Sequence, residues 1–162
     1  MNDIIIEQTK EILETEHILS ALSNISALIY HEIPFISWAG YYFYNNDELI
    51  LGPFQGKVAC SKIKVGKGVC GVSFEKRMLL NVPDVHKFEG HIACDSESCS
   101  ELVIPLMYED KIFGVLDLDS NQYYRFGSAD EELFTEITDL ISKKLYNLKG
   151  EFNLDSGSLY NS

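Results

Sequence analysis

The four cysteines are the residues of this chain best suited to redox chemistry. Cys60, Cys70, Cys94 and Cys99 all lie in the segment Gly52–Ser120. No two of them have the Cys-x-x-Cys spacing of a thioredoxin-type pair or a zinc knuckle. Folding must therefore bring the thiols together. Several thiols meeting beside acidic residues would favour thiol–disulfide exchange.

Two aspartates are spaced to form an acidic pair. Asp117 and Asp119 are two residues apart in a predicted strand, Ile112–Asp119, so both carboxylates should project from one face of the sheet. An exposed strand would leave them in solvent, but Phe113 and Val115 share their face and we expect part of it to be covered. Two covered carboxylates repel each other, which raises at least one pKa or requires a cation such as a ligand amine. The residues expected on the opposite face are Ile112, Gly114, Leu116 and Leu118.

A third acid and two aromatic residues extend this set. Glu101 begins the neighbouring predicted strand; alone it has the character of a surface acid, but beside the two aspartates it would be the third acid of one pocket. Trp38, Gly40 and Tyr42 alternate along another predicted strand and would form an aromatic wall with a gap. Such residues commonly fill a core. The wall would also suit a small thioether or sulfoxide.

A glycine-rich stretch precedes the second cysteine. Gly66-x-Gly68-x-x-Gly71 superficially matches a dinucleotide-binding motif. That motif requires a parallel strand–helix–strand unit and an acid about 20 positions further on. The nearest acid, Asp84, comes too soon. We therefore interpret the glycines as residues that let the backbone bend sharply before Cys70.

A metal site is a minor alternative. Cys94, Cys99, His86 and His91 are of the types that zinc prefers, but their spacing lacks the paired short-knuckle pattern. We expect no metal and no other cofactor.

Helical patterns lie at both ends of the chain. The segment from Asp3 to about Tyr30 has a helical pattern, with an apolar stripe formed by Ile18, Leu22, Ile25 and Ile29. A second long helix should begin at Ser128, which would act as its N-cap because Glu131 lies three residues on. A short helix is expected at Gly68–Lys76.

The middle of the chain has the composition of strands. The predicted strands are Trp38–Tyr44, Glu48–Phe54, Val58–Val65, Glu101–Tyr108 and Ile112–Asp119, all rich in β-branched and aromatic residues. The segment Asn81–Ser100 reads as a long irregular loop, which in a compact domain is usually functional or mobile. The predicted fold is α+β: the terminal helices cover one face of an antiparallel sheet, and the loop lies on the other.

Length and charge limit the classes of function. The chain has 162 residues, 46% of them hydrophobic, which suits one globular domain. We assign residues 1–148 to that domain and expect residues 149–162 to be a disordered tail. A net charge of −12 argues against nucleic acids and anionic membranes as partners. No apolar run is long enough for a membrane span and no signal peptide is visible, so we expect a cytoplasmic protein with reduced cysteines.

Several motifs together resemble a known family. The motifs are Gly52–Cys60, Gly66–Gly71, Asp84-Val85-His86, Gly90–Asp95 and Gly114–Ser120. In their order and spacing, the chain resembles the free methionine-(R)-sulfoxide reductases, which are single GAF domains. The resemblance is dense from Trp38 to Asp130. It implies a six-stranded antiparallel sheet, and an enzyme that reduces the free amino acid sulfoxide rather than the residue in a protein.

The resemblance also implies roles for the cysteines. Cys94 corresponds to the nucleophile and Cys60 to the resolving thiol, so that a sulfenic acid on Cys94 would condense to a disulfide. Cys70 corresponds to the third family cysteine, a possible second relay. Cys99 departs from the family pattern. A thioredoxin-type dithiol is the expected reductant.

The same resemblance implies a substrate site and an assembly. Glu101, Asp117 and Asp119 correspond to the family's pocket acids, one to hold the substrate amine and a protonated one to donate to the sulfoxide oxygen. Trp38 and Tyr42 correspond to its aromatic wall. A homodimer is expected, and the apolar stripe on the terminal helices would permit it.

Local electrostatics favour a different nucleophile. Cys70 is predicted near a helix N-terminus, which lowers the pKa of a thiol, whereas Asp95 should raise that of Cys94. We keep Cys94 as the nucleophile because of the family pattern and its place in the long loop. A protonated His91 would offset Asp95. The two alternatives to an enzyme are a non-catalytic GAF sensor of a small molecule and a thiol redox sensor.

Overall fold

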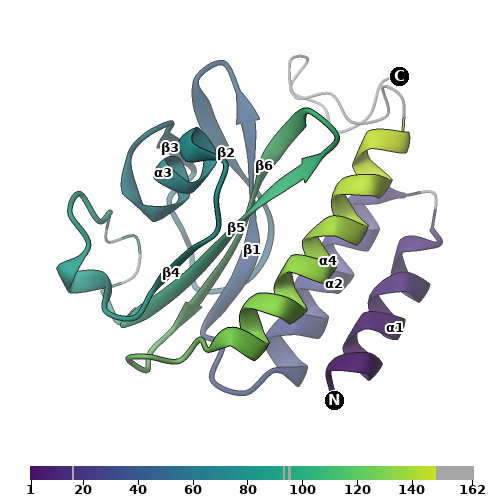
Figure 1. Cartoon of the computed structure of the whole chain (residues 1–162), viewed down its shortest axis with the longest axis horizontal. Coiled ribbons are helices and arrows are strands. Elements are labelled where there is room, and N and C mark those ends of the chain that lie inside the picture. The colour runs from purple at the N-terminus through teal and green to yellow at the C-terminus, as the bar shows by residue number, and fades with distance from the viewer. Residues whose placement is uncertain (16, 93, 95, 149–162) are drawn as a thin grey trace.

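The structure, a computed structural model, describes residues 1–15, 17–92, 94 and 96–148. Its centre is a six-stranded sheet in the order β3-β2-β1-β6-β5-β4, in which all the pairings are antiparallel (Figure 1). The strands are β1 (Trp38–Asn45), β2 (Glu48–Gly56), β3 (Lys62–Lys64), β4 (Leu80–Val82), β5 (Ser100–Tyr108) and β6 (Lys111–Ser120).

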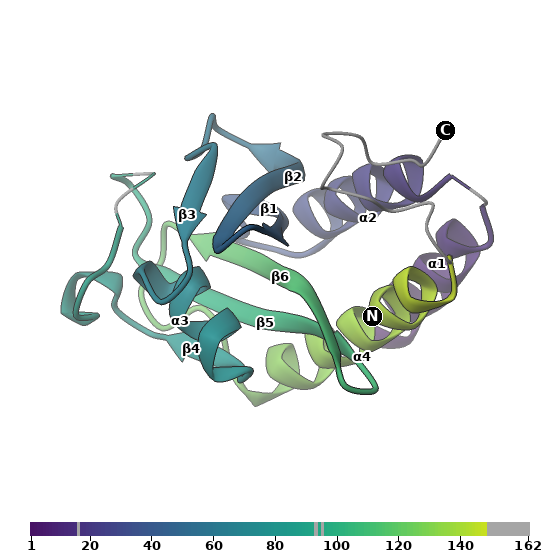
Figure 2. The same cartoon turned by 90° about the horizontal axis from the view of Figure 1, so that it is seen from above.

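Three helices cover one face of this sheet. They are α1 (Asn2–Leu13), α2 (Ile18–Glu32) and α4 (Ser128–Asn147), and α3 (Gly68–Lys76) lies on the opposite face (Figure 2). The main core lies between the three helices and the sheet, where residues such as Ile25, Leu118 and Ile137 are fully buried. The predicted α+β architecture is thus confirmed. Among the described residues, no helix has the length and apolarity that crossing a membrane requires.

The N-terminal helical segment is two helices, not the single pattern expected from Asp3 to Tyr30. α1 ends at Leu13, and His17 has an extended backbone before α2 begins. Glu14 is the C-cap of the first helix, and between the two helices the Thr15 Oγ1 accepts a hydrogen bond from the His17 N–H at 3.2 Å. α2 turns its apolar stripe toward the sheet, where Ile18 and Ile29 are wholly buried. The stripe is used within the domain and offers no surface to a second subunit.

Two strand predictions need correction. Val58–Val65 is not a strand over its length: only Lys62–Lys64 pairs with β2, and the Val58 side chain is 88% exposed. The segment Asn81–Ser100 is not wholly irregular, because Asn81 and Val82 belong to β4, which pairs with β5. A single 3₁₀ turn, Val85–Lys87, follows within the loop.

A β-bulge alters the faces predicted for β6. Leu106 pairs with Gly114 and the next residue of β5 pairs with Ile112, so Phe113 is an extra residue. Phe113 therefore packs with the helix-side core, and Ile112 packs on the other side of the sheet. From Gly114 onward the expected alternation holds. At Gly114 a side chain would collide with the Tyr42 carbonyl oxygen, so the bulge needs glycine there.

The N-cap of α4 is Gly127, one residue before the predicted Ser128. The reciprocal contact comes from Asp130, whose Oδ2 accepts a hydrogen bond from the Gly127 N–H at 2.8 Å. Arg125 donates to the same oxygen at 3.0 Å. The predicted pattern of an N-cap residue with an acid three positions later is therefore present, but as Gly127 with Asp130 and one residue earlier than predicted. The predicted C-terminal tail lies outside the described residues.

Candidate active site

A small pocket lies on the sheet face opposite the three helices, beside α3. Its free volume is about 40 Å³. The residues predicted for the site that line it are Trp38, Tyr42, Cys70, Cys94, Glu101, Asp117 and Asp119. Side chains from β1, β5, β6, α3 and the loop after β4 thus meet at one place.

A disulfide joins Cys60 to Cys94 at this pocket. The two residues are 34 positions apart in sequence, and their Cα atoms are 5.5 Å apart. They are the pair that the family resemblance implies. Cys60 follows β2 and is held by Tyr42, whose hydroxyl donates to the Cys60 carbonyl oxygen at 2.9 Å. Cys70 and Cys99 are free thiols.

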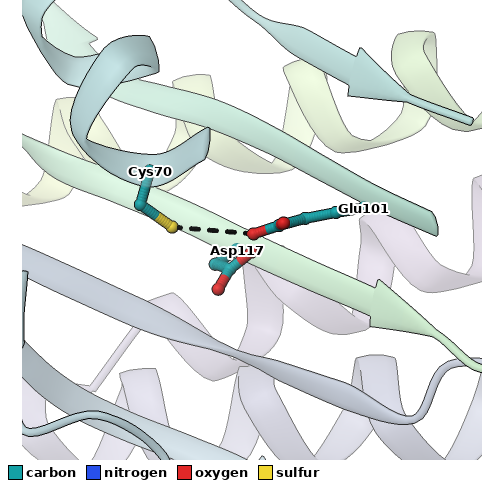
Figure 3. Close-up of side chains that lie close together, drawn as sticks. All are labelled: Cys70, Glu101 and Asp117. Carbon is teal, nitrogen blue, oxygen red and sulfur yellow. Dashed lines mark hydrogen bonds between the residues drawn. The ribbon is translucent and has the colours of Figure 1, made fainter. Parts of the chain in front are cut away.

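The three predicted acids converge because of the strand register. Glu101 of β5 pairs directly with Asp119 of β6, and Asp117 lies two residues along on the same face. Glu101 and Asp117 are both buried. Figure 3 shows Cys70 of α3 pointing at this pair, with its Sγ 3.9 Å from Glu101 Oε1. One oxygen of Asp117, Oδ1, is buried without a hydrogen-bond partner among the described residues.

Burial and mutual repulsion keep protons in this cluster. Burial raises the pKa of Glu101 well above its ordinary value of 4.5, and the nearby Asp117 and Asp119 raise it further. Burial also raises the pKa of Asp117, but hydrogen bonding from Glu101 and Cys70 lowers it part of the way back. Glu101 is therefore the acid that holds the proton, and Asp117 is the one whose charged form is supported. This is the division of roles expected from two carboxyls in one pocket.

Cys70 does not have the lowered pKa that its place near a helix N-terminus predicted. Burial raises the pKa of its thiol well above the ordinary value, and the neighbouring Asp117 and Glu101 add to the effect. Burial, together with the charges of the nearby Asp117, Glu101 and Asp119, outweighs the weak positive end of a nine-residue helix. The electrostatic argument for Cys70 as the nucleophile is therefore wrong. Asp95, the other residue in that argument, lies outside the described residues.

His91 contacts the acid cluster, which the sequence reasoning did not foresee. Its Nε2 lies 4.0 Å from Glu101 Oε2. Burial lowers the pKa of His91, and His86 lowers it further. A protonated Glu101 carries no charge to hold a proton on the imidazole, so His91 is neutral and does not supply the positive charge proposed to offset Asp95. The sequence marked His91 by its position in the Gly90–Asp95 motif, as a candidate zinc ligand and as a charge to offset Asp95, but not as a neighbour of Glu101.

The aromatic wall is present, but its gap is filled. The Trp38 and Tyr42 rings stack with centroids 6.1 Å apart, and the Phe54 ring also stacks on Trp38, with centroids 5.2 Å apart. The Trp38 ring lies over Gly40, where an added Cβ would be 2.7 Å from Cη2. Trp38 Nε1 also donates to the Lys57 carbonyl oxygen at 3.0 Å. Glycine at position 40 thus lets the indole lie flat against the strand.

The glycine-rich stretch forms a turn, as expected. Gly66 and Gly68 have positive φ values of 82° and 63°, and the Gly66 N–H donates to the Gly71 carbonyl oxygen at 2.9 Å. A Cβ on Gly71 would lie 2.6 Å from the Lys64 carbonyl oxygen. The glycines join β3 to α3 in an antiparallel sheet, without the parallel unit that dinucleotide binding requires.

The metal ligands suggested from the long loop are not assembled. Within the described part of the chain, the one group with ligand atoms close enough for a metal is Cys70, Glu101 and Asp117. Cys94 is committed to the disulfide, and the Cys99 thiol instead donates to the Glu97 carbonyl oxygen at 3.6 Å.

A larger hollow of about 370 Å³ lies elsewhere, between the end of α2 and the end of β6. Tyr30, Phe35 and Gln122 are among its lining residues. No cysteine or carboxylate lines it in the described residues, so the smaller pocket is the candidate active site.

The fold and site define the class of protein. The model of the GAF domain family matches residues 3–145. The chain belongs to the GAF-domain family, and within it to the group that contains the free methionine-R-sulfoxide reductases.

Three relatives illustrate the similarity. The free methionine-R-sulfoxide reductase of Escherichia coli is 46% identical over 127 residues, covering 78% of this chain and 77% of its own. That of Saccharomyces cerevisiae is 47% identical over 130 residues, covering 75% and 72%. The crystal structure of the Neisseria meningitidis enzyme in complex with its substrate matches with a TM-score of 0.87 at 32% identity, covering 91% of this chain and 90% of that one.

Proposed function

We propose that this protein reduces free methionine-(R)-sulfoxide to methionine with its own thiols. The observation that carries the proposal is the Cys60–Cys94 disulfide, placed beside a pocket that holds a buried acid of raised pKa and a second buried carboxyl group. The named relatives support it. A disulfide of this kind is the expected product of one reduction cycle.

In the proposed first step, Cys94 attacks the sulfur of the sulfoxide. Glu101 gives a proton to the sulfoxide oxygen, which gives an intermediate with a bond between the two sulfur atoms. The hydroxyl group then passes from the methionine sulfur to the Cys94 sulfur as the sulfur–sulfur bond breaks, so methionine leaves and Cys94 becomes a sulfenic acid. Glu101 suits this role because burial keeps it protonated where an exposed glutamate would be ionised. His91, 4.0 Å away, is positioned to take up a proton from solvent and pass it on to Glu101.

In the second step the Cys60 thiol condenses with the sulfenic acid. Water leaves and the disulfide forms, so two thiols have been oxidised for one sulfoxide reduced. A thioredoxin-type dithiol then restores both thiols by exchange, becoming a disulfide itself. Cys70 stays outside this exchange in the structure, and its role as a second relay stays a prediction.

Asp117 is the proposed anchor for the substrate amine. Its buried Oδ1 has no hydrogen-bond partner among the described residues, and an ammonium group would supply both a donor and a compensating charge. Asp119 adds negative charge on the same face. A methionine sulfoxide residue inside a peptide has an uncharged amide nitrogen and could not satisfy this oxygen in the same way. Trp38 and Tyr42 would contact the methyl thioether end.

The experiment uses the two sulfoxide epimers separately. The protein is incubated with dithiothreitol and each epimer, and free methionine is measured over time. Turnover of the R epimer alone supports the proposal. Binding without turnover would instead support a sensor, and a disulfide formed with peroxide but with neither epimer would support a redox switch. A homodimer is part of the proposal by resemblance only, and the sedimentation coefficient tests it.

A further inference from the structure

The floor of the pocket carries one donor more than the substrate amine requires. An ammonium group is satisfied by carboxylate oxygens, which Asp117 and Asp119 provide. In the cluster of Cys70, Glu101 and Asp117, Cys70 adds a sulfur donor that an amine does not need. All three residues are buried, and they reach the same point from α3, β5 and β6 (Figure 3).

The spacing of these donors fits a metal ion. The ligand atoms of Cys70, Glu101 and Asp117 all lie within 4.8 Å of one another, and the sulfur-to-oxygen separation is 3.9 Å. Zinc bonds of 2.0–2.3 Å in a tetrahedral arrangement place ligand atoms roughly 3.3–3.8 Å apart. The sulfur-to-oxygen separation is already close to this range, and closing the widest separation, 4.8 Å, around an ion would take a change of roughly 1–1.5 Å. The unpartnered Oδ1 of Asp117 is already available as a ligand.

An imidazole beside this group of three and the space for an ion are also present. His91 Nε2 lies 4.0 Å from the second oxygen of Glu101, on the loop that borders the pocket. The free volume of about 40 Å³ is enough for an ion with a water or two, since one water needs roughly 10–15 Å³. The net charge of −12 raises the local concentration of cations.

We propose that Cys70, Glu101 and Asp117 bind one thiophilic divalent cation of the zinc class, with His91 as a fourth ligand. On binding, the thiol proton of Cys70 and the carboxyl proton of Glu101 pass to solvent, and the cation takes their place. Because the cation and an amine both need Asp117, each excludes the other. Zinc-class ions should therefore inhibit the proposed reduction of the sulfoxide. Only this inhibition rests on the proposed function; the binding of the cation does not.

The chemistry of the donors selects the ion. A thiolate with carboxylate and imidazole ligands suits zinc, cobalt and cadmium, whereas magnesium and calcium take oxygen ligands. Cobalt is the useful probe, because a bond between cobalt and a thiolate gives a charge-transfer band in the near ultraviolet. Magnesium is the matched negative ion.

The binding test uses the disulfide form of the full chain, in which Cys60 and Cys94 cannot coordinate. Its preparation is checked by titrating two free thiols in the unfolded protein. Cobalt should give the thiolate band with a stoichiometry of one, and zinc should remove it. Cys70→Ser should abolish the band, Cys99→Ser should keep it, and Asp117→Asn should weaken binding by at least about tenfold. Circular dichroism checks that each variant is folded.

The outcomes separate the two proposals. No band in the wild-type protein, or the same band in Cys70→Ser, would overturn the metal site whether or not the protein is a reductase. Free methionine should displace cobalt from the wild-type protein, and simultaneous binding would overturn mutual exclusion. If the protein binds cobalt through Cys70 but reduces neither sulfoxide epimer, the metal site stands and the proposed function fails.

Discussion

Glu101 on β5 lies directly opposite Asp119 on β6, and the register of these two strands creates the acidic pocket. A shift of the register by one residue would turn one of the two side chains to the helix-covered face. The extra residue at Phe113 lies on the same strand pair, toward the other end from the acids. The position of the acids therefore depends on the pairing of the whole hairpin.

Replacing Glu101 by Gln should make the protein more stable at neutral pH. The pKa of Glu101 is raised in the folded state, so above about pH 4.5 the native protein binds a proton that the unfolded chain releases. The free energy of unfolding therefore falls as the pH rises toward the native pKa, and Glu101→Gln removes that decline. Urea unfolding of the disulfide forms at several pH values measures it. Glu132→Gln, on the exposed side of α4, is the control, and parallel curves for wild type and Glu101→Gln would contradict the prediction.

Serine variants should separate the two steps of the reaction. Without added reductant, Cys94→Ser should release no methionine, because no nucleophile remains. Cys60→Ser should release one methionine per chain and leave a sulfenic acid on Cys94, detectable by mass spectrometry after trapping. Cys99→Ser, which removes a free thiol that lies outside the disulfide, should behave like wild type. Loss of the first turnover in Cys70→Ser alone would mean that the roles are misassigned.

Tyr42→Phe should slow disulfide formation more than methionine release. The change keeps the ring in the wall but removes the hydrogen bond to the Cys60 carbonyl oxygen, worth about 1 kcal/mol net. A loss of that size corresponds to a rate reduction of about fivefold. Rapid mixing that follows thiol loss and methionine release separately measures it. Tyr44→Phe is the matched control, since the Tyr44 hydroxyl makes an exposed 3.3 Å contact with Asp47; equal effects of the two variants would refute a positioning role for Tyr42.

Gly40→Ala should raise KM and lower stability together. The added methyl group would collide with the Phe54 Cβ and lie 2.7 Å from Trp38 Cη2, so the indole has to move. Overpacking of this kind costs about 1–3 kcal/mol. Urea unfolding and the KM for the sulfoxide measure the two effects. Gly127→Ala, whose new methyl group meets no atom within 4 Å, should leave KM unchanged. A wild-type KM in Gly40→Ala would show that Trp38 does not contact the substrate.

Features with a local period were predictable from the sequence. The alternation of Asp117 and Asp119 against Leu116 and Leu118 places the aspartates together, as the structure has them. α3 was predicted with its bounds, Gly68–Lys76, from the glycines that precede it. In each case the signal and the structure that it indicates lie within a few residues of each other.

Features that depend on long-range pairing were not predictable in this way. The Cys60–Cys94 pair and the alignment of Glu101 with Asp119 came from the family resemblance, because neither strand's own pattern determines its register. β4 has only three residues, too few to show a period. Val58 has the β-branched character of a strand residue, yet it lies in the segment that carries Cys60 to the pocket. The contact of His91 with Glu101 arises only when the loop has folded over α3.

The bond between Cys60 and Cys94 closes a circle of chain that contains β3, α3 and β4. For a separation of 34 residues, such closure restricts the unfolded chain by about 4 kcal/mol in the chain-entropy picture. Each turnover would then open and close this loop, which also contains Cys70. The disulfide form of the protein should therefore unfold at a higher temperature than the reduced form. Oxidising conditions would favour the more stable form.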